Sequence, residues 1–481
     1  MTAPTSPPHP APTGAGTVRR PRTGRNQELL LVLFAGVLAS SFALGAHAAL
    51  LQDISTAALV MPTIFIAMMV GAHLVVRYFA PYADPVILPC VALINGLGLV
   101  FIGRLDLGHA EPAERPDIAA FGSFGYRQLL WSFVAVVAFS AVLIVIRDHR
   151  SLSRYAYTTA LAGVVLVAVP AVLPASLSDP NGSGAKLWIA IPGVGQIQPS
   201  EFAKLLLMCF FAYYLVRKRE VLSLASKQVL GIALPRPRDL GPVLVVWAAS
   251  LLVLVGSRDL GTSLMYFGCF IAMLYIATER TSWLLIGLGL FMAGVLLAYS
   301  IFSHFRGRVA IWLDPFSDPE GLGYQPIQAL FGLGTGGLFG TGPGVGAAES
   351  IPVGYSDYIT AGLGEEIGLF GLTALLAVYL VIVERGMRTG LLVRDLFGKL
   401  LAAGLAFSLG LQVFVIVGGV SKLIPLTGLT TPFLSYGGSS LVANWILAAL
   451  LLRISDAARR PPVPPKPATK LSSAPTEVVR L

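Results

Sequence analysis

Residues 398–418 read GKLLAAGLAFSLGLQVFVIVG, an apolar run whose only charged side chain is Lys399. A helix of about 20 apolar residues crosses the hydrocarbon core of a bilayer, which is roughly 30 Å thick. Similar runs lie near residues 28–49, 57–79, 86–103, 128–146, 155–175, 200–216, 240–256, 261–278, 282–302, 358–384 and 435–453. The sequence therefore predicts an all-α fold, a polytopic membrane helix bundle of about twelve transmembrane helices.

The composition agrees with this class. Hydrophobic residues make up 55% of the chain and charged residues only 12%, with a mean hydropathy of +0.75. A soluble domain carries about 25% charged residues, so a soluble globule is excluded. Cys90, Cys209 and Cys269 fall within apolar runs, where cysteine acts as a small hydrophobe, and they indicate neither disulfides nor a cysteine metal site.

The cations predict the orientation in the membrane. If the N-terminus is inside, the inner loops and tails hold 25 of the 34 Lys and Arg residues, and the outer loops hold eight. The Pro-rich segments 1–27 and 456–481 then read as disordered cytoplasmic tails, and segment 300–358 as an extracellular loop. The net charge of +9 reflects this asymmetry and an attraction to anionic membrane lipids, and it needs no nucleic acid.

The outer segment carries the first candidates for chemistry. Residues 312–325 read WLDPFSDPEGLGYQ, in which Asp-Pro turns present the carboxylates of Asp314 and Asp318. A carboxylate within reach of a weak nucleophile can act as a general base. The alternative is that both residues cap short helices, as Asp before Pro often does.

Charges within the apolar runs are the second group of candidates, because each needs a partner or a polar cavity. Glu201 and Lys204 lie three residues apart on one helix face, which fits an anion or sugar pocket, or a pair that only neutralises itself. Asp259 stands at a helix start, where it serves a site or caps the helix. The adjacent Glu365 and Glu366 exceed what compensation of one helix dipole requires.

Two glycine-rich stretches complete the pattern. Residues 332–344, GLGTGGLFGTGPG, lack the Gly-Lys-Ser/Thr ending of a phosphate-binding loop, so ATP hydrolysis is not indicated. We interpret this run as a flexible loop whose exposed backbone admits a bulky substrate, with a re-entrant segment as the alternative. Residues 425–440, PLTGLTTPFLSYGGSS, form another polar stretch, which must lie inside the protein or beside a wet cavity.

These motifs recur in order in one known family. The set comprises Gly184–Ile189, Gln198–Lys204, Asp259–Ser263, Trp312–Gln325, Asp357 with Glu365–Gly368, and Pro432–Ser440. It resembles the SEDS family, to which RodA and FtsW proteins belong, over residues of about 86 to 455. The resemblance is closest to the actinobacterial RodA branch, whose two extra N-terminal helices would correspond to residues 28–85.

The resemblance implies a peptidoglycan glycosyltransferase of the bacterial cytoplasmic membrane, active in cell elongation and shape maintenance, with division as the related role. Such enzymes polymerise lipid II at the outer face beside a class B penicillin-binding protein, a transpeptidase. The family's essential loop carboxylate matches Asp318, which would be the catalytic general base. We expect the substrate to be bound by Lys186, Glu201, Lys204, Asp259, Arg306, Arg308, Gln325, Glu365, Glu366, Ser435 and Tyr436.

The leaving group would be a lipid diphosphate, which calls for cations or for a divalent metal such as Mg²⁺ or Mn²⁺. Lys186, Lys204, Arg258, Arg306, Arg308 and Lys422 are the outer or intramembrane cations available, although headgroup contact is the alternative for Arg306 and Arg308. No dedicated metal cage is apparent. Two other functions stay open from the sequence, namely a lipid II flippase and a scaffold for a transpeptidase.

Overall fold

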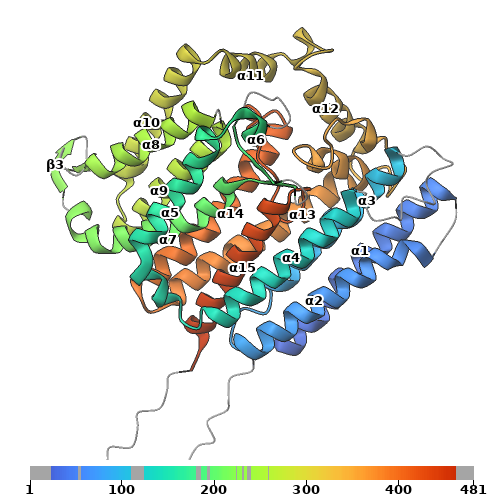
Figure 1. Cartoon of the computed structure of the whole chain (residues 1–481), viewed down its shortest axis with the longest axis horizontal. Helices are drawn as coiled ribbons and strands as arrows, with labels where there is room; N and C mark the ends of the chain where they lie inside the picture. The colour runs from blue at the N-terminus through green and yellow to red at the C-terminus, as the bar shows by residue number, and fades with distance from the viewer. Residues whose placement is uncertain are drawn as a thin grey trace, which may run out of the picture.

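The computed structural model is a helical bundle (Figure 1) and describes residues 23–52, 56–109, 124–179, 186–191, 195–223, 225–229, 232–235, 240–257 and 259–461. All twelve predicted apolar runs are helical. Among the described residues, eleven helices are long and apolar enough to cross a membrane, and the twelfth run, α8 (Gly241–Ser257), is 17 residues long. The chain is therefore a multi-pass membrane protein.

The remaining bundle helices have the following bounds: α1 (Arg25–Leu51), α2 (Val60–Phe79), α3 (Ile87–His109), α4 (Phe124–Val145), α5 (Ala156–Val172), α7 (Pro199–Ser223), α9 (Leu260–Thr278), α10 (Thr281–Ile301), α13 (Ile359–Leu392), α14 (Leu396–Val420) and α15 (Gly438–Arg459). Residues 25–27 and 456–459 are thus helical, which shortens the two predicted disordered tails. Residues 1–22 and 462–481 of the two tails, like Arg258, lie outside the described residues.

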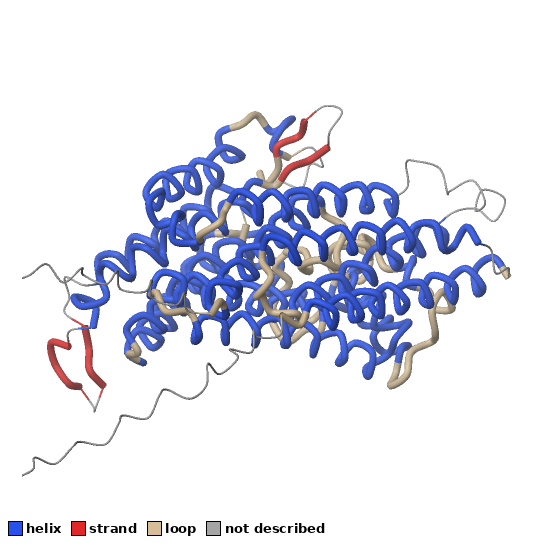
Figure 2. Tube along the Cα trace, turned by 90° about the horizontal axis from the view of Figure 1, so that it is seen from below, coloured by secondary structure: helices blue, strands red, loops and turns tan. Residues whose placement is uncertain are grey.

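Short elements connect the helices. They are η1 (Thr56–Leu59), η3 (His149–Tyr155), α6 (Ala175–Ser178), α11 (Ser303–Leu313), η5 (Pro315–Ser317), α12 (Tyr324–Gly336) and η6 (Ala348–Ser350). Two antiparallel hairpins, β1 (Ile189–Ile191) with β2 (Gly195–Ile197) and β3 (Ala225–Val229) with β4 (Ile232–Pro235), lie at the margins of the bundle (Figure 2). Segment 300–358, expected as a loop, is therefore partly helical.

Burial separates central helices from peripheral ones. In an apolar stretch of 18 residues within α15, 83% of the residues are buried. In the corresponding stretches of the spans that contain α5 and α10, only 17% are buried. In the hydrocarbon core, lipid tails cover apolar side chains as well as protein does, so a helix at the rim needs no polar face. The exposed Leu and Val side chains of α5 and α10 are consistent with contact to lipid.

Both described chain ends meet at one end of the bundle. Asp84, in the turn between α2 and α3, forms an ion pair with Arg459 at the end of α15, and the Ala83 carbonyl accepts a hydrogen bond from Arg25 at the start of α1. In Figure 1 this end lies at the bottom, and α11 and α12 lie at the top. Segment 300–358 and the two chain ends are therefore on opposite sides of the bundle.

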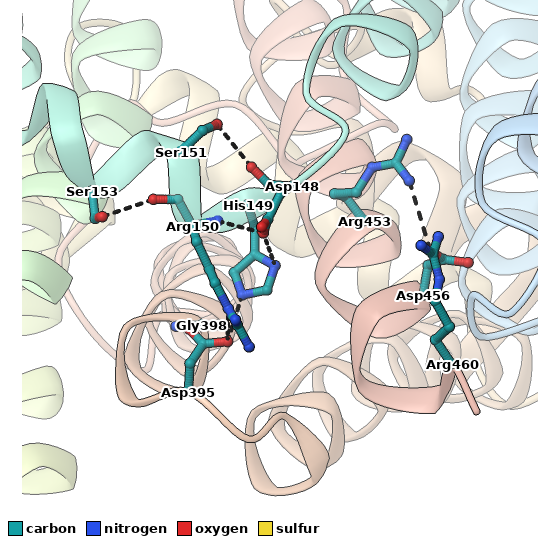
Figure 3. A network of polar contacts seen from close by, with 10 residues as sticks. All are labelled: Asp148, His149, Arg150, Ser151, Ser153, Asp395, Gly398, Arg453, Asp456 and Arg460. Atoms are coloured by element: carbon teal, nitrogen blue, oxygen red, sulfur yellow. Dashed lines mark hydrogen bonds and ion pairs between the residues drawn. The ribbon is translucent and has the colours of Figure 1, made fainter. Parts of the chain in front are cut away.

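The end of the bundle where the two described chain ends meet also holds a polar network (Figure 3). Asp395 lies between α13 and α14 and pairs with Nε2 of His149 at 2.8 Å and with Nε of Arg150 at 3.2 Å. Burial acts to raise the pKa of Asp395, but the hydrogen bonds from His149, Arg150 and the Gly398 amide outweigh it and hold the pKa below its usual range. This network joins the α4–α5 connection to α14.

The helix α13 is broken inside the membrane-spanning region. Gly368 has φ of 69° and ψ of −176°, so the helical hydrogen-bond ladder is interrupted there. Segment 337–342 supplies the missing partners: the Thr341 amide donates to the Glu365 carbonyl at 2.9 Å, and the Leu369 amide donates to the Gly337 carbonyl at 2.9 Å. The Gly342 amide likewise donates to the Glu366 carbonyl, and the Phe370 amide donates to the Leu338 carbonyl. Glu365, Glu366 and Gly368 are buried, and an unpaired buried backbone group is costly, so segment 337–342 is a structural requirement.

This pairing corrects the interpretation of the glycine-rich run as an open, substrate-admitting loop. A Cβ at Gly336 would lie 2.4 Å from the Gly364 carbonyl oxygen, and one at Gly340 would lie 2.2 Å from that of Glu366. The glycines therefore allow close approach to the protein's own backbone. The alternative in the sequence analysis, a segment that folds back against the protein, describes these residues better.

The broken helix gives a stability prediction. Gly368→Ala puts a Cβ at φ of +69°, where it would lie 2.2 Å from the Gly340 nitrogen. We expect strain and overpacking to lower the free energy of unfolding by about 2–4 kcal/mol, measured by thermal unfolding in detergent. Gly289→Ala in α10, which has nothing within 4 Å of the added Cβ, is the matched control and should unfold at or above the wild-type temperature. Equal stability of the two variants would contradict the pairing.

Candidate functional site

Asp318 lies directly after η5, between α11 and α12 at the end of the bundle opposite the described chain ends, and its side chain is exposed. Its Oδ2 accepts a hydrogen bond from the Leu322 amide at 2.9 Å, and among the described residues it forms no ion pair. Gly321 permits this turn, because a Cβ there would lie 2.4 Å from the carboxylate. The turn holds one carboxylate oxygen and leaves the group available to solvent.

Asp314 is the N-cap of η5 and accepts a hydrogen bond from the Phe316 amide at 3.1 Å. The capping role considered from the sequence is therefore confirmed for Asp314, and Asp318 makes a similar turn contact. Such a contact positions a carboxylate and leaves it able to accept further hydrogen bonds, since each oxygen can accept more than one. Local geometry alone does not separate the two residues.

Glu201 and Lys204 form a buried ion pair, as their spacing predicts. The Lys204 ammonium lies 2.9 Å from Glu201 and donates to the side-chain oxygen of Gln412 at 2.8 Å. Gln412 in turn donates to the Thr430 carbonyl at 2.9 Å. This chain of contacts joins α7 to α14 and to the segment before α15. Gln412 was not among the predicted site residues, because an isolated Gln in an apolar run gives no indication of its partner.

A second group of charged residues comprises Asp259 before α9, Asp357 before α13 and Arg308 of α11. Asp259 caps α9 by accepting from the Thr262 amide at 2.9 Å, as the capping alternative predicts. Arg308 of α11 donates to the Leu426 carbonyl at 3.2 Å, and its positive charge acts on both Asp259 and Asp357. Burial raises the pKa of Asp357, opposed by the Ser356 hydroxyl and by Arg308. Arg308 is therefore a centre of opposite charge for two carboxylates.

Asp357 belongs to a recognised motif but was not predicted as a site residue. It lies in the last turn before α13, and its hydrogen-bond partner Ser356 also accepts through its carbonyl from Ser435 at 2.8 Å. The signal available in the sequence was a lone acid between two tyrosines. Only the tertiary structure brings it near Arg308, which comes from another element.

Ser435 and Tyr436 connect the segment before α15 to the segment before α13. The Ser435 hydroxyl also accepts from the Thr431 amide at 2.9 Å, and the Tyr436 amide donates to the Tyr355 carbonyl at 2.8 Å. The ring of Tyr436 lies 5.2 Å from that of Phe124 and 5.6 Å from that of Tyr355. The Ser435 side chain is thus occupied by internal contacts, whereas the Tyr436 ring is half-buried.

Glu365 and Glu366 are buried and point into the protein. Glu366 forms an ion pair with Arg104 of α3, which also binds Glu349 of η6, and Glu365 accepts from the Ala347 amide at 3.0 Å. These contacts anchor the segment between α12 and α13. Arg104 was missed as a partner because it stands at the margin of an apolar run, 262 positions before Glu366 in the chain.

The other predicted residues are dispersed. Lys186 donates to the Leu173 carbonyl at 3.0 Å and so caps the last turn of α5. Arg306 is exposed on α11 and donates to the Ser300 carbonyl at 3.3 Å, while Gln325 lies half-buried in the first turn of α12. The structure therefore groups Glu201 with Lys204, Asp259 with Arg308, and Glu365 with Glu366, and leaves Asp318 in the exposed turn.

The described part of the chain contains no group of three or more His, Cys, Asp or Glu side chains arranged to hold a metal ion. The divalent cation that the sequence analysis allows stays a prediction.

Comparison with known proteins identifies relatives over nearly the whole chain. The model of the cell cycle protein family that comprises FtsW, RodA and SpoVE matches residues 84–460. The peptidoglycan glycosyltransferase RodA of Mycobacterium tuberculosis is 51% identical over 95% of this chain and 96% of its own. The corresponding protein of Mycobacterium leprae is 48% identical over 91% and 92%. A probable peptidoglycan glycosyltransferase FtsW of Geobacter metallireducens is 34% identical over 67% and 82%.

Solved structures give the same picture of the fold. A chain of a peptidoglycan synthase complex, in which polymerization and crosslinking are coordinated, aligns with a TM-score of 0.61 and 27% identity over 79% of this chain and 99% of its own. The rod shape determining protein RodA of Thermus thermophilus aligns with a TM-score of 0.55 and 23% identity over 79% and 98%, which concerns the fold alone.

The buried pair gives a second prediction. Lys204→Met leaves the Glu201 carboxylate buried without its cation, and we expect the free energy of unfolding to fall by about 3–5 kcal/mol. The double variant Glu201→Gln, Lys204→Met removes both charges and should recover most of that loss in thermal unfolding. If the losses of the two single variants simply add in the double variant, the pair is not coupled.

Proposed function

The chain belongs to the cell cycle protein family of FtsW, RodA and SpoVE, and on that premise we propose that it polymerises lipid II with Asp318 as the general base. The class of activity, peptidoglycan glycosyltransferase, follows from the identity of 51% with a RodA that spans nearly all of both chains. The substrate, the residue roles, the partner and the orientation in the membrane are the parts that we propose.

The observation that carries the proposal is the contrast between Asp318 and the buried carboxylates. Glu201 and Glu366 are each paired with a cation inside the bundle, whereas Asp318 is exposed and held by one backbone amide. A general base must lie within hydrogen-bond reach of the hydroxyl that it deprotonates, and a buried carboxylate that is already paired with a cation is not accessible in this way. An exposed carboxylate in a defined turn can approach a substrate hydroxyl.

In the proposed step, the 4-hydroxyl of a GlcNAc unit in one lipid-linked disaccharide attacks the anomeric carbon of the MurNAc at the end of the growing chain. The new glycosidic C–O bond forms as the bond from that carbon to the phosphate oxygen breaks. The electron pair leaves with undecaprenyl diphosphate, and the hydroxyl proton passes to Asp318. The exposed guanidinium of Arg306 is the cation that we assign to the diphosphate, because the positive charge of Arg308 already acts on Asp259 and Asp357.

We further propose that a class B penicillin-binding protein is the partner. The support is the structural relative from a peptidoglycan synthase complex, which joins polymerization to crosslinking. The role in elongation and shape follows in the same way from the RodA relatives. A flippase or a scaffold remains as an outcome of the test below.

The catalytic prediction compares two neighbouring carboxylates. In a polymerisation assay with lipid II and the transpeptidase, Asp318→Asn should lose on the order of 10²- to 10⁴-fold in rate, because the general base is removed. Asp314→Asn is the matched control, since it alters a cap in the same turn and should retain the rate within a few-fold. Circular dichroism and thermal unfolding establish that both variants are folded.

Three outcomes would contradict parts of this proposal. An unchanged rate for Asp318→Asn removes the general base. Lipid II translocation by a wild-type protein that forms no polymer favours a flippase. Equal turnover with and without the transpeptidase shows that the partner does not activate the enzyme.

The orientation gives a separate prediction. Ser317 and Ser151 are both exposed. Ser317 lies in η5 between α11 and α12, at the top of Figure 1, and Ser151 lies in η3 near the end of α15 (Figure 3), so Ser317→Cys and Ser151→Cys are at opposite ends of the bundle. In a background without Cys90, Cys209 and Cys269, a membrane-impermeant maleimide should label Ser317→Cys on intact cells, and Ser151→Cys only after permeabilisation. The reverse pattern would place the Asp318 turn in the cytoplasm, where lipid II polymerisation at the outer face is impossible.

A further inference from the structure

Two helices of this protein lie outside the shared family core. The family model begins at residue 84, after α1 and α2, whereas the Mycobacterium tuberculosis relative matches 95% of the chain and so includes most of this pair. We call α1 and α2 the N-terminal helix pair. In Figure 1 the pair forms one flank of the bundle, beside α3 and α4. Its contacts show what it supports.

The inner end of the pair is fixed by buried charges. Glu28 of α1 lies 2.6 Å from Arg25 and 2.7 Å from Nδ1 of His73 on α2, and all three side chains are at most 3% exposed. Arg25 also donates to the Ala83 carbonyl in the turn before α3. Charged groups in an apolar bundle are costly unless they remain together. This cluster therefore fixes the position of α1 along its axis.

The outer end of α1 contacts the turn that follows the glycine-rich pairing segment. A Cβ at Gly45 would lie 3.4 Å from the Cβ of Pro343, and one at Gly344 would lie 2.8 Å from the Ala46 carbonyl oxygen. Gly344 has φ of +77°, a conformation that favours glycine. The two backbones are thus in direct contact.

This turn is held from its other side by the core. Arg104 of α3 binds Glu349, Glu366 and the Gly346 carbonyl, so segment 341–349 lies between α1 and the break in α13. The preceding segment pairs with that break and continues backward into α12. The helix α12 begins six residues after Asp318. The position of the Asp318 turn therefore depends on a chain of backbone contacts that begins at α1.

We propose that the N-terminal helix pair positions the Asp318 turn, and that Glu28 is a positioning residue for the transferase at a distance from the chemistry. The buried charges hold α1 at a fixed height. Through Gly45 and Ala46, α1 then supports the turn at Pro343 and Gly344, and with it the base of α12. This inference rests on the proposed function, because it concerns the placement of the proposed base.

The experiment combines disruption at the inner end with a covalent link at the outer end. Glu28→Gln leaves Arg25 without its counter-charge, and we expect kcat to fall about ten- to a hundredfold at little-changed KM, as for a misplaced catalytic group. Gly45→Cys with Pro343→Cys, in a background without the three native cysteines, should form a disulfide, because the Cβ separation of 3.4 Å is close to the usual range. Added to Glu28→Gln, this disulfide should restore the rate to within about threefold of wild type, and reduction should abolish the rescue.

The matched control is Arg77→Gln. It removes an exposed hydrogen bond to Asn26 between the same two helices, one turn from His73, and it should leave the rate unchanged. The double cysteine variant without Glu28→Gln should also work at the wild-type rate when oxidised. If Glu28→Gln does not fold, Gly45→Leu tests the outer contact alone and should lower kcat with a normal unfolding temperature.

The outcomes separate this inference from the proposed function. A wild-type protein that forms no polymer refutes the function, whatever the variants do. A polymerising wild type with an equally active Glu28→Gln, a slow Glu28→Gln that the disulfide does not rescue, or a disulfide that fails to form overturns the positioning role alone. Amide hydrogen exchange gives a second readout, in which Glu28→Gln should exchange faster over residues 337–349 and the oxidised rescue variant should not.

Discussion

The backbone pairing between segment 337–342 and the break in α13 is the contact on which the position of segment 300–358 depends. A broken helix in lipid must find hydrogen-bond partners within the protein, because none come from solvent. Residues 337–342 provide them, and glycine at 340 and 368 lets the two backbones approach. The break turns Glu365 and Glu366 toward the 341–349 turn, where they bind the Ala347 amide and Arg104. One interruption of α13 thus determines where the outer segment is attached.

The charged residues divide into two groups according to what they contact. Pairs inside the bundle, such as Glu201 with Lys204 and Arg25 with Glu28, neutralise each other and join helices. The cost of burying such groups is offset only when both partners are present, so these pairs specify the packing more than they stabilise it. The carboxylates of the turn after α11 are different, because they are exposed and held by backbone amides. We therefore expect the chemistry at the exposed carboxylates, which are not neutralised by a buried cation.

The sequence predicts the membrane helices well because hydropathy over about 20 residues is a local property. It also predicts the pairing of Glu201 with Lys204, since a spacing of three on a helix brings side chains together. It does not predict that Arg308 faces Asp259 and Asp357, or that Arg104 binds Glu366, because these contacts join distant segments. The glycine-rich run was misread for the same reason: glycine permits close approach, but its partner is a helix break that no local pattern reveals. Whether Asp318 is the base stays a prediction, as do the roles of the other site residues.

The geometry of α1 explains why a contact so far from Asp318 can matter. From Glu28 to Gly45 the helix runs 17 residues, or about 25 Å at a rise of 1.5 Å per residue. The length of an unbroken helix is nearly constant, so contacts that fix Glu28 at one end of α1 also fix the position of Gly45, near its other end, along the helix axis. The broken α13 cannot provide the same reference, because its two halves meet at Gly368 without a continuous hydrogen-bond ladder. The proposed placement of the base, on an exposed turn connected to a broken helix, therefore requires a continuous helix as a reference, and α1 is such a helix.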